Sequence, residues 1–239
     1  MRLLSMDRFA LIFDGLREKR VGVVDGFGNP GDRLLDAAAR QLLDAFGIRH
    51  VTVNPFADAP GTYPADVLLL AGGGSMGGPR QCVLIRQRAL EHGLPCIVLP
   101  QSFHAPEECA AYEKVYVRER ASLNLWPPGI LGPDLALGYD FPAMPAPRFD
   151  RGVFLRADGH AMFADRGAVD PAAFCYTPQD YFAFVAAYRH IVTDRLHLAI
   201  VALGLGRKAT LLPVAYHKNR SMWETWLKDL GCTWSDRPS

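Results

Sequence analysis

Hydrophobic and polar positions along the chain follow two alternating periods, and this alternation predicts an α/β fold. Continuous apolar runs with β-branched residues, such as "RVGVVDGF" at 20–27, are typical of strands buried on both faces of a parallel sheet. Apolar residues spaced three or four apart, as in Leu35, Ala38 and Leu42, are typical of one face of a helix. Strands that alternate with helices form βαβ units around a parallel sheet.

The same pattern divides the chain into two halves. The first half has predicted strands at 20–27, 49–55, 65–74, 95–102 and 114–120, helices at 32–47 and 79–93, and a last element at 129–137. The second half has predicted strands at 153–158, 191–194 and 208–216, and helices at 178–190, 195–204 and 218–231. Between them, "FPAMPAPRFDRG" at 141–152 has no hydrophobic period and three closely spaced prolines, which indicates a linker. We therefore expect two α/β domains, residues 1–143 and a smaller one at 144–239.

Composition and charge exclude several classes of protein. The formal net charge is +1 without a basic stripe, so we expect no nucleic-acid partner. The five cysteines are scattered and none has zinc-ligand spacing, so we expect reduced thiols in the cytoplasm and no metal. Residues 1–20 predict an amphipathic helix with basic flanks. Two interpretations stay open, a helix packed on the protein, which we favour, and a peripheral contact with the inner face of the membrane.

The glycine-rich stretch "GFGNPGD" lies between the first strand and the first helix, where parallel sheets place their ligand sites. It matches neither the dinucleotide-binding fingerprint nor the P-loop, so nucleotide binding is not supported. Asp32 stands where a helix N-cap belongs, and it either caps the helix or contacts a sugar hydroxyl.

Three further polar or glycine-rich stretches follow predicted strands. Residues 72–78 hold five glycines, which suggests backbone kept bare for a ligand. Gln101 and Ser102 end a buried strand as hydrogen-bonding groups. Arg118 lies in "VRER", which is either a ligand-binding arginine or part of a surface ion-pair cluster.

Arg195 and His197 stand two residues apart at the start of an otherwise apolar helix. A structural helix start needs only a cap, which Thr193 or Asp194 supplies. The arginine therefore needs another explanation. His197 taken alone is equally consistent with a partly buried structural histidine.

These stretches together resemble the polysaccharide pyruvyl transferase family. The resemblance rests on short pieces in the family's order: "GNPGD", "AGGG", "LPQS", "VRERAS", "PDLAL", "TDRLH" and "HKN". It implies two Rossmann-like domains arranged as in GT-B glycosyltransferases. It also implies transfer of the pyruvyl group of phosphoenolpyruvate to a sugar of an exopolysaccharide or lipid-linked oligosaccharide, as a cyclic ketal, with release of phosphate. The stretch 151–192 is shorter than in typical members, so the second domain is abbreviated.

The resemblance also implies roles for individual residues. Arg195 and His197 would bind the donor and catalyse, the arginine by pairing with phosphate or carboxylate and the histidine by delivering a proton to the methylene carbon. Asp32 joins them as a catalytic candidate. The candidates for substrate binding are Asn29, Gly73, Gly74, Gln101, Ser102, Arg118, Arg156 and Lys218. No cofactor is expected besides the donor substrate.

Two other functions remain as alternatives. A GT-B glycosyltransferase that uses a nucleotide sugar would have the same architecture, but it usually has a carboxylate for the ribose in its second domain. Asp180 is the candidate there, and no recognisable motif surrounds it. A non-catalytic carbohydrate-binding relative would lack a charged anion site.

Overall fold

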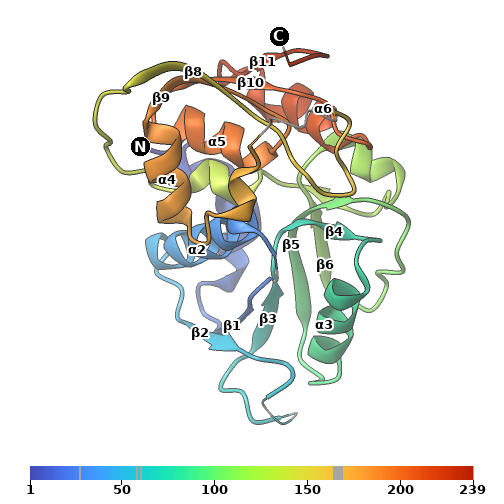
Figure 1. Cartoon of the computed structure of the whole chain (residues 1–239). Helices are drawn as coiled ribbons and strands as arrows, with labels where there is room; N and C mark the ends of the chain where they lie inside the picture. Colours follow the sequence, from blue (N-terminus) through green and yellow to red (C-terminus); the bar gives the residue numbers. More distant parts are fainter. Residues whose placement is uncertain (27, 58, 60, 164–168, 239) are drawn as a thin grey trace. The chain divides into compact units, whose positions relative to one another are not determined.

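A computed structural model describes residues 1–26, 28–57, 59, 61–163 and 169–238 (Figure 1). The chain forms two compact units. Unit 1 comprises Met1–Leu3, Gly28–Leu34 and Tyr139–Ser239, and unit 2 comprises Leu4–Phe27 and Leu35–Gly138. Each unit is α/β with a parallel sheet, as the hydrophobic pattern predicts. The boundary expected after Ala143 and the GT-B-like arrangement stay predictions.

Unit 2 contains a sheet in which every pairing is parallel. Its order is β2-β1-β3-β5-β6-β7, and β4 pairs with β5. The strands are β1 (Val21–Val24), β2 (His50–Val53), β3 (Val67–Leu70), β4 (Gly73–Met76), β5 (Cys96–Phe103), β6 (Lys114–Val117) and β7 (Ile130–Leu131). The predicted strands are confirmed, but β4 is an addition, because the glycine-rich stretch pairs with β5 instead of forming only a turn.

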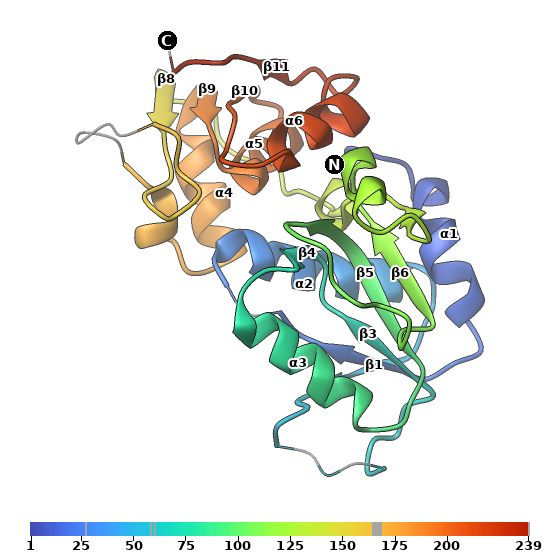
Figure 2. The ribbon, with the colours of Figure 1, turned by 90° about the vertical axis from the view of Figure 1, so that its right-hand side faces the viewer.

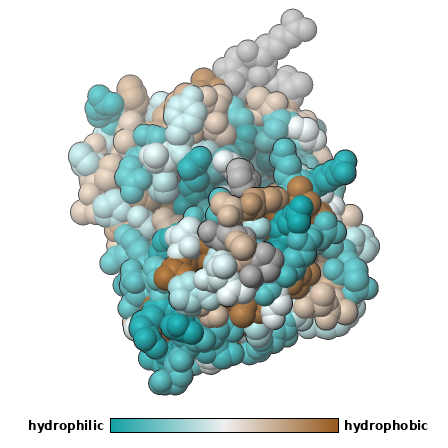
Figure 3. All heavy atoms as spheres, turned by 90° about the horizontal axis from the view of Figure 1, so that it is seen from below, coloured by the Kyte–Doolittle hydropathy of each residue, from teal (hydrophilic) through white to brown (hydrophobic). Residues whose placement is uncertain are grey.

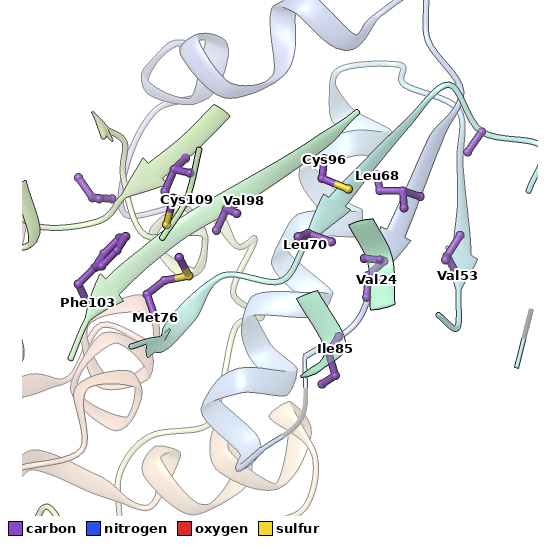
Figure 4. Close-up of a cluster of buried hydrophobic side chains, with 14 residues drawn as sticks. Val24, Val53, Leu68, Leu70, Met76, Ile85, Cys96, Val98, Phe103 and Cys109 are labelled. Carbon is purple, nitrogen blue, oxygen red and sulfur yellow. The ribbon is translucent and has the colours of Figure 1, made fainter. Parts of the chain in front are cut away.

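Helices cover both faces of this sheet (Figure 2). They are α1 (Ala10–Phe13), α2 (Pro30–Ala45) and α3 (Arg80–Leu90). On the α3 side, Val24, Leu70 and Val98 from the strands pack with Ile85 from the helix in one buried cluster (Figure 4). Burial of this kind stabilises the fold by roughly 25 cal/mol per Å² of apolar surface.

The single N-terminal helix predicted for residues 1–20 is not observed. The segment breaks into α1 and two flanking 3₁₀ turns, Met6–Phe9 and Asp14–Leu16. Phe9 and Phe13 are fully buried, so this face of the segment packs into the protein, whereas Leu11 is exposed. Of the two interpretations of this segment, the structure supports packing on the protein.

Unit 1 has a four-stranded parallel sheet in the order β11-β10-β9-β8. The strands are β8 (Phe149–Phe154), β9 (Tyr188–Thr193), β10 (Lys208–Leu211) and β11 (Thr233–Trp234). The helices are α4 (Pro178–Ala186), α5 (Leu196–Gly204) and α6 (Lys218–Met222), and a π-helical turn, Trp223–Leu227, continues α6. β8 begins inside the expected linker, because Phe149 already pairs with Tyr188 of β9.

Helix α5 is apolar on all sides, and eight of its residues are buried. Such a helix belongs inside the fold. Gly204, the last residue of α5, lets the ring of Phe141 pack closely against the helix, since a Cβ at Gly204 would lie 2.3 Å from that ring.

Apolar side chains on the face shown in Figure 3 lie in scattered patches among hydrophilic ones. Among the described residues, no helix is both long and apolar enough to cross a membrane. All five cysteines are unpaired, and four of them are buried. Burial raises the pKa of Cys96 to about 11, so its thiol stays protonated at neutral pH.

Candidate active site

The first turn of α2 belongs to unit 1 and is closed by two of the candidate residues. The side-chain oxygen of Asn29 accepts a hydrogen bond from Gly31 N at 2.9 Å. The carboxylate of Asp32 accepts one from Asn29 N at 3.0 Å. Asn29 is therefore the N-cap of α2, followed by Pro30 as the first helical residue. The sequence places Asp32 at the N-cap position, and this prediction is wrong. It lies in the first turn of α2, where its carboxylate accepts the hydrogen bond from the backbone N–H of the N-cap residue Asn29.

His197, in the first turn of α5, lies against this turn of α2. A Cβ added to Gly31 would be 2.3 Å from Nδ1 of His197 and 2.9 Å from its Cβ. The "GNPGD" and "TDRLH" stretches, far apart in the sequence, therefore meet inside unit 1. His197 is partly exposed, whereas its helical neighbours are buried. A partly exposed imidazole at the meeting point of two motifs suits a catalytic role better than a role in the core.

Arg195 precedes α5 and is almost fully buried. Its backbone N–H donates to the hydroxyl of Thr193 at 3.0 Å, but Arg195 itself is the N-cap of α5 and no side chain caps the helix, so the cap expected from Thr193 or Asp194 is not formed. Its guanidinium forms two hydrogen bonds of 2.5 Å with Asp170 and one of 3.1 Å with Asp158. Burial lowers the pKa of Arg195, but the bonds and charge of Asp170 outweigh it and raise the pKa. The anion site expected here is thus already occupied by two carboxylates of the chain itself.

Arg156 lies two residues after the end of the neighbouring strand β8 and shares one of these carboxylates. Its Nε lies 2.8 Å from Asp158, and its backbone N–H donates to Asp194 at 2.8 Å. Burial raises the pKa of Asp194 to about 6, although the Arg156 backbone hydrogen bond and the charges of both arginines act against this. The strand ends of unit 1 therefore hold two arginines and three aspartates in one network.

The late "HKN" stretch contributes to this region through its asparagine. Asn219 is fully buried, and its amide donates to the backbone oxygens of Asp194 at 2.7 Å and Leu212 at 2.9 Å. It thus fixes the chain just before Arg195. Lys218, the predicted contact, is partly exposed at the start of α6, with its Nζ 5.3 Å from the centre of the Tyr216 ring.

In unit 2, buried polar side chains form hydrogen bonds with the glycine-rich stretch 72–78 and with the residues next to it. Gln101 is buried, accepts from Ser75 N at 3.0 Å and donates to Ala71 O at 2.6 Å. Arg86 bonds both to Ser75 and to Glu107, and Glu107 in turn accepts from Gly77 N at 2.5 Å. Gln101 thus positions the stretch, while Gly73 and Gly74 lie on β4 itself.

Gly77 shows why this stretch needs glycine. Its φ of 63° is in the left-handed region, and a Cβ there would lie 2.1 Å from Ala105 O. Gly73, with φ of 136°, is also outside the range that other residues favour.

Arg118 and Ser102 lie in the core of unit 2. Arg118 donates to Ser102 Oγ and to Asp134, each at 2.8 Å, and Arg118 and Asp134 are fully buried. Glu119 is fully buried as well, so the surface ion-pair cluster considered as the alternative is wrong. The guanidinium of Arg118 is paired inside the unit, because an unpaired charge there would be costly, and its contact with a substrate stays a prediction.

Sequence reasoning missed the groups that complete both networks. In unit 1 these are Asp158, Asp170 and Asn219, and in unit 2 they are Arg86, Glu107 and Asp134. The short spacing of Arg156 and Asp158 in the sequence is a signal that could have identified Asp158. Among the described residues, no cluster of histidine, cysteine and acidic side chains has the arrangement of a metal site.

Comparison with known proteins places the chain in a family. The profile of the polysaccharide pyruvyl transferase family matches residues 29–216, which is most of the chain. The chain belongs to this family of transferases. No curated protein shows a significant match.

A solved structure with the same fold is that of a functionally uncharacterised protein from Klebsiella pneumoniae subsp. pneumoniae. It superposes with a TM-score of 0.79 at 16% sequence identity, over 98% of this chain and 100% of that chain. At this identity the similarity establishes the shared fold alone.

Proposed function

We propose that this protein transfers the pyruvyl group of phosphoenolpyruvate to two hydroxyls of a sugar in an exopolysaccharide or lipid-linked oligosaccharide. Membership of the pyruvyl transferase family supports the reaction class. The single observation that favours catalysis by this chain is the contact of His197 with the first turn of α2, which joins two family motifs at one place in unit 1.

In the proposed reaction His197 delivers a proton to the methylene carbon of the donor, and a sugar oxygen bonds to C2 as its own proton leaves. The bond from C2 to the phosphate oxygen then breaks with its electrons on phosphate, and the second sugar oxygen closes the ketal. One hydroxyl proton replaces the proton that His197 gave up, and the other leaves with phosphate. Histidine suits this step because it exchanges protons readily near neutral pH.

Asp32 and Arg195 have supporting roles in this proposal. The carboxylate of Asp32 is partly exposed and held by Asn29 N, so it can accept a hydrogen bond from a sugar hydroxyl. Arg195 supplies charge to the donor's carboxylate or phosphate. Asp170 fixes the orientation of the guanidinium through a two-point contact.

The function is tested by incubating the protein with phosphoenolpyruvate and candidate lipid-linked oligosaccharides. We expect release of inorganic phosphate that depends on the acceptor, and a gain in acceptor mass equal to one pyruvyl ketal. A parallel incubation with nucleotide sugars serves as the comparison. Transfer of a glycosyl group there, without phosphate release from phosphoenolpyruvate, would overturn the proposal.

Replacing Gly31 by Ala is expected to displace His197. Alanine favours helix by about 1 kcal/mol over glycine, so the substitution by itself would stabilise α2. The added Cβ, however, would lie 2.3 Å from the imidazole, which must move. Misplacement of a catalytic group by about 1 Å can cost roughly 10²-fold in rate, so we expect such a loss in phosphate release.

Gly15→Ala is the matched control, because nothing lies within 4 Å of a Cβ at Gly15. Thermal unfolding and phosphate release are measured for both variants. Unchanged turnover in folded Gly31→Ala would show that catalysis does not depend on this contact.

A further inference from the structure

The carboxylate of Asp158 lies between two buried arginines. Its oxygens are 2.8 Å from Nε and 3.1 Å from Nη2 of Arg156, and 3.1 Å from Nη2 of Arg195. One carboxylate thus bridges the two guanidiniums at the ends of neighbouring strands.

The three partners differ sharply in burial. The side chains of Arg156 and Arg195 are 7% and 8% exposed, whereas that of Asp158 is 44% exposed. Asp170, the other carboxylate on Arg195, is only 9% exposed. Asp158 is therefore the member of this network that faces water, and Asp170 is its buried carboxylate partner.

The backbone around Asp158 allows its side chain to leave. Ala157, Asp158 and Gly159 are all exposed, and the carboxylate is otherwise bonded only to the exposed turn through His160 N at 3.1 Å among the bonds observed. Rotation of the exposed Asp158 side chain can leave the backbone hydrogen bonds of this turn in place, from Ala157 N to Asp170 and from Ala161 N to Asp158 O.

The charges show what such a movement would uncover. With Asp158 in place, two arginines face Asp158 and Asp170, and Asp194 also interacts with the charges of both arginines. Without Asp158, the two almost fully buried guanidiniums lose the carboxylate that they share, and the local charge becomes more positive. Among the described residues, Nη1 of Arg156 is also buried without a hydrogen-bond partner. Two buried guanidiniums with an open donor bind oxyanions strongly.

Asp158 is ionised whenever the protein is at neutral pH. Partial burial raises the pKa of its carboxyl, but hydrogen bonds from Arg156 and His160 N and the charges of both arginines bring the pKa down to about 2. Its carboxylate therefore competes as an anion with any anionic ligand of the two arginines.

We propose that Asp158 occupies, in the free protein, the place of a ligand oxyanion between Arg156 and Arg195, and that a carboxylate or phosphate group of the ligand displaces it. This inference rests on the proposed function for the identity of the ligand, phosphoenolpyruvate, which carries both groups. Asp158 acts as an internal competitor that keeps the two arginines aligned until the ligand arrives.

The test compares Asp158→Asn with Asp150→Asn. Asparagine keeps the size of the side chain and removes its charge. Asp150 lies in the same unit, is 95% exposed and pairs with Arg189, so the control loses one charge without touching the network. Binding of pyruvate, inorganic phosphate and phosphoenolpyruvate is measured by calorimetry, and thermal unfolding confirms that each variant is folded.

We expect Asp158→Asn to bind at least one of these oxyanions about tenfold more tightly than the parent protein, because the competing state is removed. Asp150→Asn should bind like the parent. Tighter binding of pyruvate alone would identify the ligand carboxylate as the displacing group, and tighter binding of phosphate alone would identify the phosphate.

Unchanged or weaker binding of all three probes by folded Asp158→Asn would overturn the inference and leave Asp158 as a fixed structural partner. The outcome is separable from that of the proposed function. Tighter oxyanion binding without phosphate release from phosphoenolpyruvate would support the competitor and refute the reaction, and turnover without tighter binding would do the reverse.

Discussion

Asp134→Ala should destabilise unit 2 by about 3–5 kcal/mol, because it removes a buried carboxylate that is paired with the buried guanidinium of Arg118. Both side chains are excluded from water, at 1% and 0% exposure, and their Nη1–Oδ2 distance is 2.8 Å. Asp134 also accepts from Ala136 N at 2.9 Å, so its loss frees a second buried group. Urea denaturation followed by circular dichroism measures the change in the free energy of unfolding.

Two further variants test the cause of this loss. Asp14→Ala removes an ion pair whose partners, Asp14 and Arg17, are half exposed, and it should cost no more than about 1 kcal/mol. The double variant Arg118→Met/Asp134→Leu removes both charges of the pair together and should be markedly more stable than Asp134→Ala. If the double variant is no more stable than the single one, packing and not charge explains the loss.

His197→Gln should lower turnover by about 10²–10⁴-fold while leaving most of the affinity for phosphoenolpyruvate. Glutamine can still donate a hydrogen bond, but it cannot deliver a proton to carbon. The substitution leaves unchanged the arginines that bind the donor in our proposal. Initial rates of phosphate release and calorimetric titration with phosphoenolpyruvate separate the two effects.

His50→Gln is the matched control, because His50 lies on β2 of unit 2 and pairs with Asp44 at 3.0 Å. It should keep the parent's rate. Turnover by His197→Gln within a few-fold of the parent would rule out His197 as the proton donor.

The sequence by itself determined the local elements and their class. The spacing of Leu35, Ala38 and Leu42 predicts the buried face of α2, and the apolar run at 20–27 predicts β1. Both predictions hold because periodic burial is a property of neighbouring residues. The family motifs likewise lie on short contiguous stretches, and the family profile covers them from Asn29 to residue 216, which leaves out the late "HKN".

The state of the charged candidates was decided only by tertiary contacts. In the sequence, Arg118 is either a ligand-binding arginine or part of a surface ion-pair cluster, and Arg195 is a candidate anion-binding residue at a helix start. Arg118 is paired with Asp134, 16 positions away, and Arg195 with Asp170, 25 positions away. No local sequence pattern specifies which carboxylate pairs with which guanidinium in the folded protein.

The same reason explains β4 and the contact between Gly31 and His197. The glycine-rich stretch becomes a strand because Gln101, Arg86 and Glu107, distant in sequence, bond to its backbone or to Ser75. Gly31 meets His197 because the start of α2 packs within unit 1. Local periodicity therefore specified the elements, whereas long-range packing of buried polar groups decided which candidate residues are brought together and which are already paired.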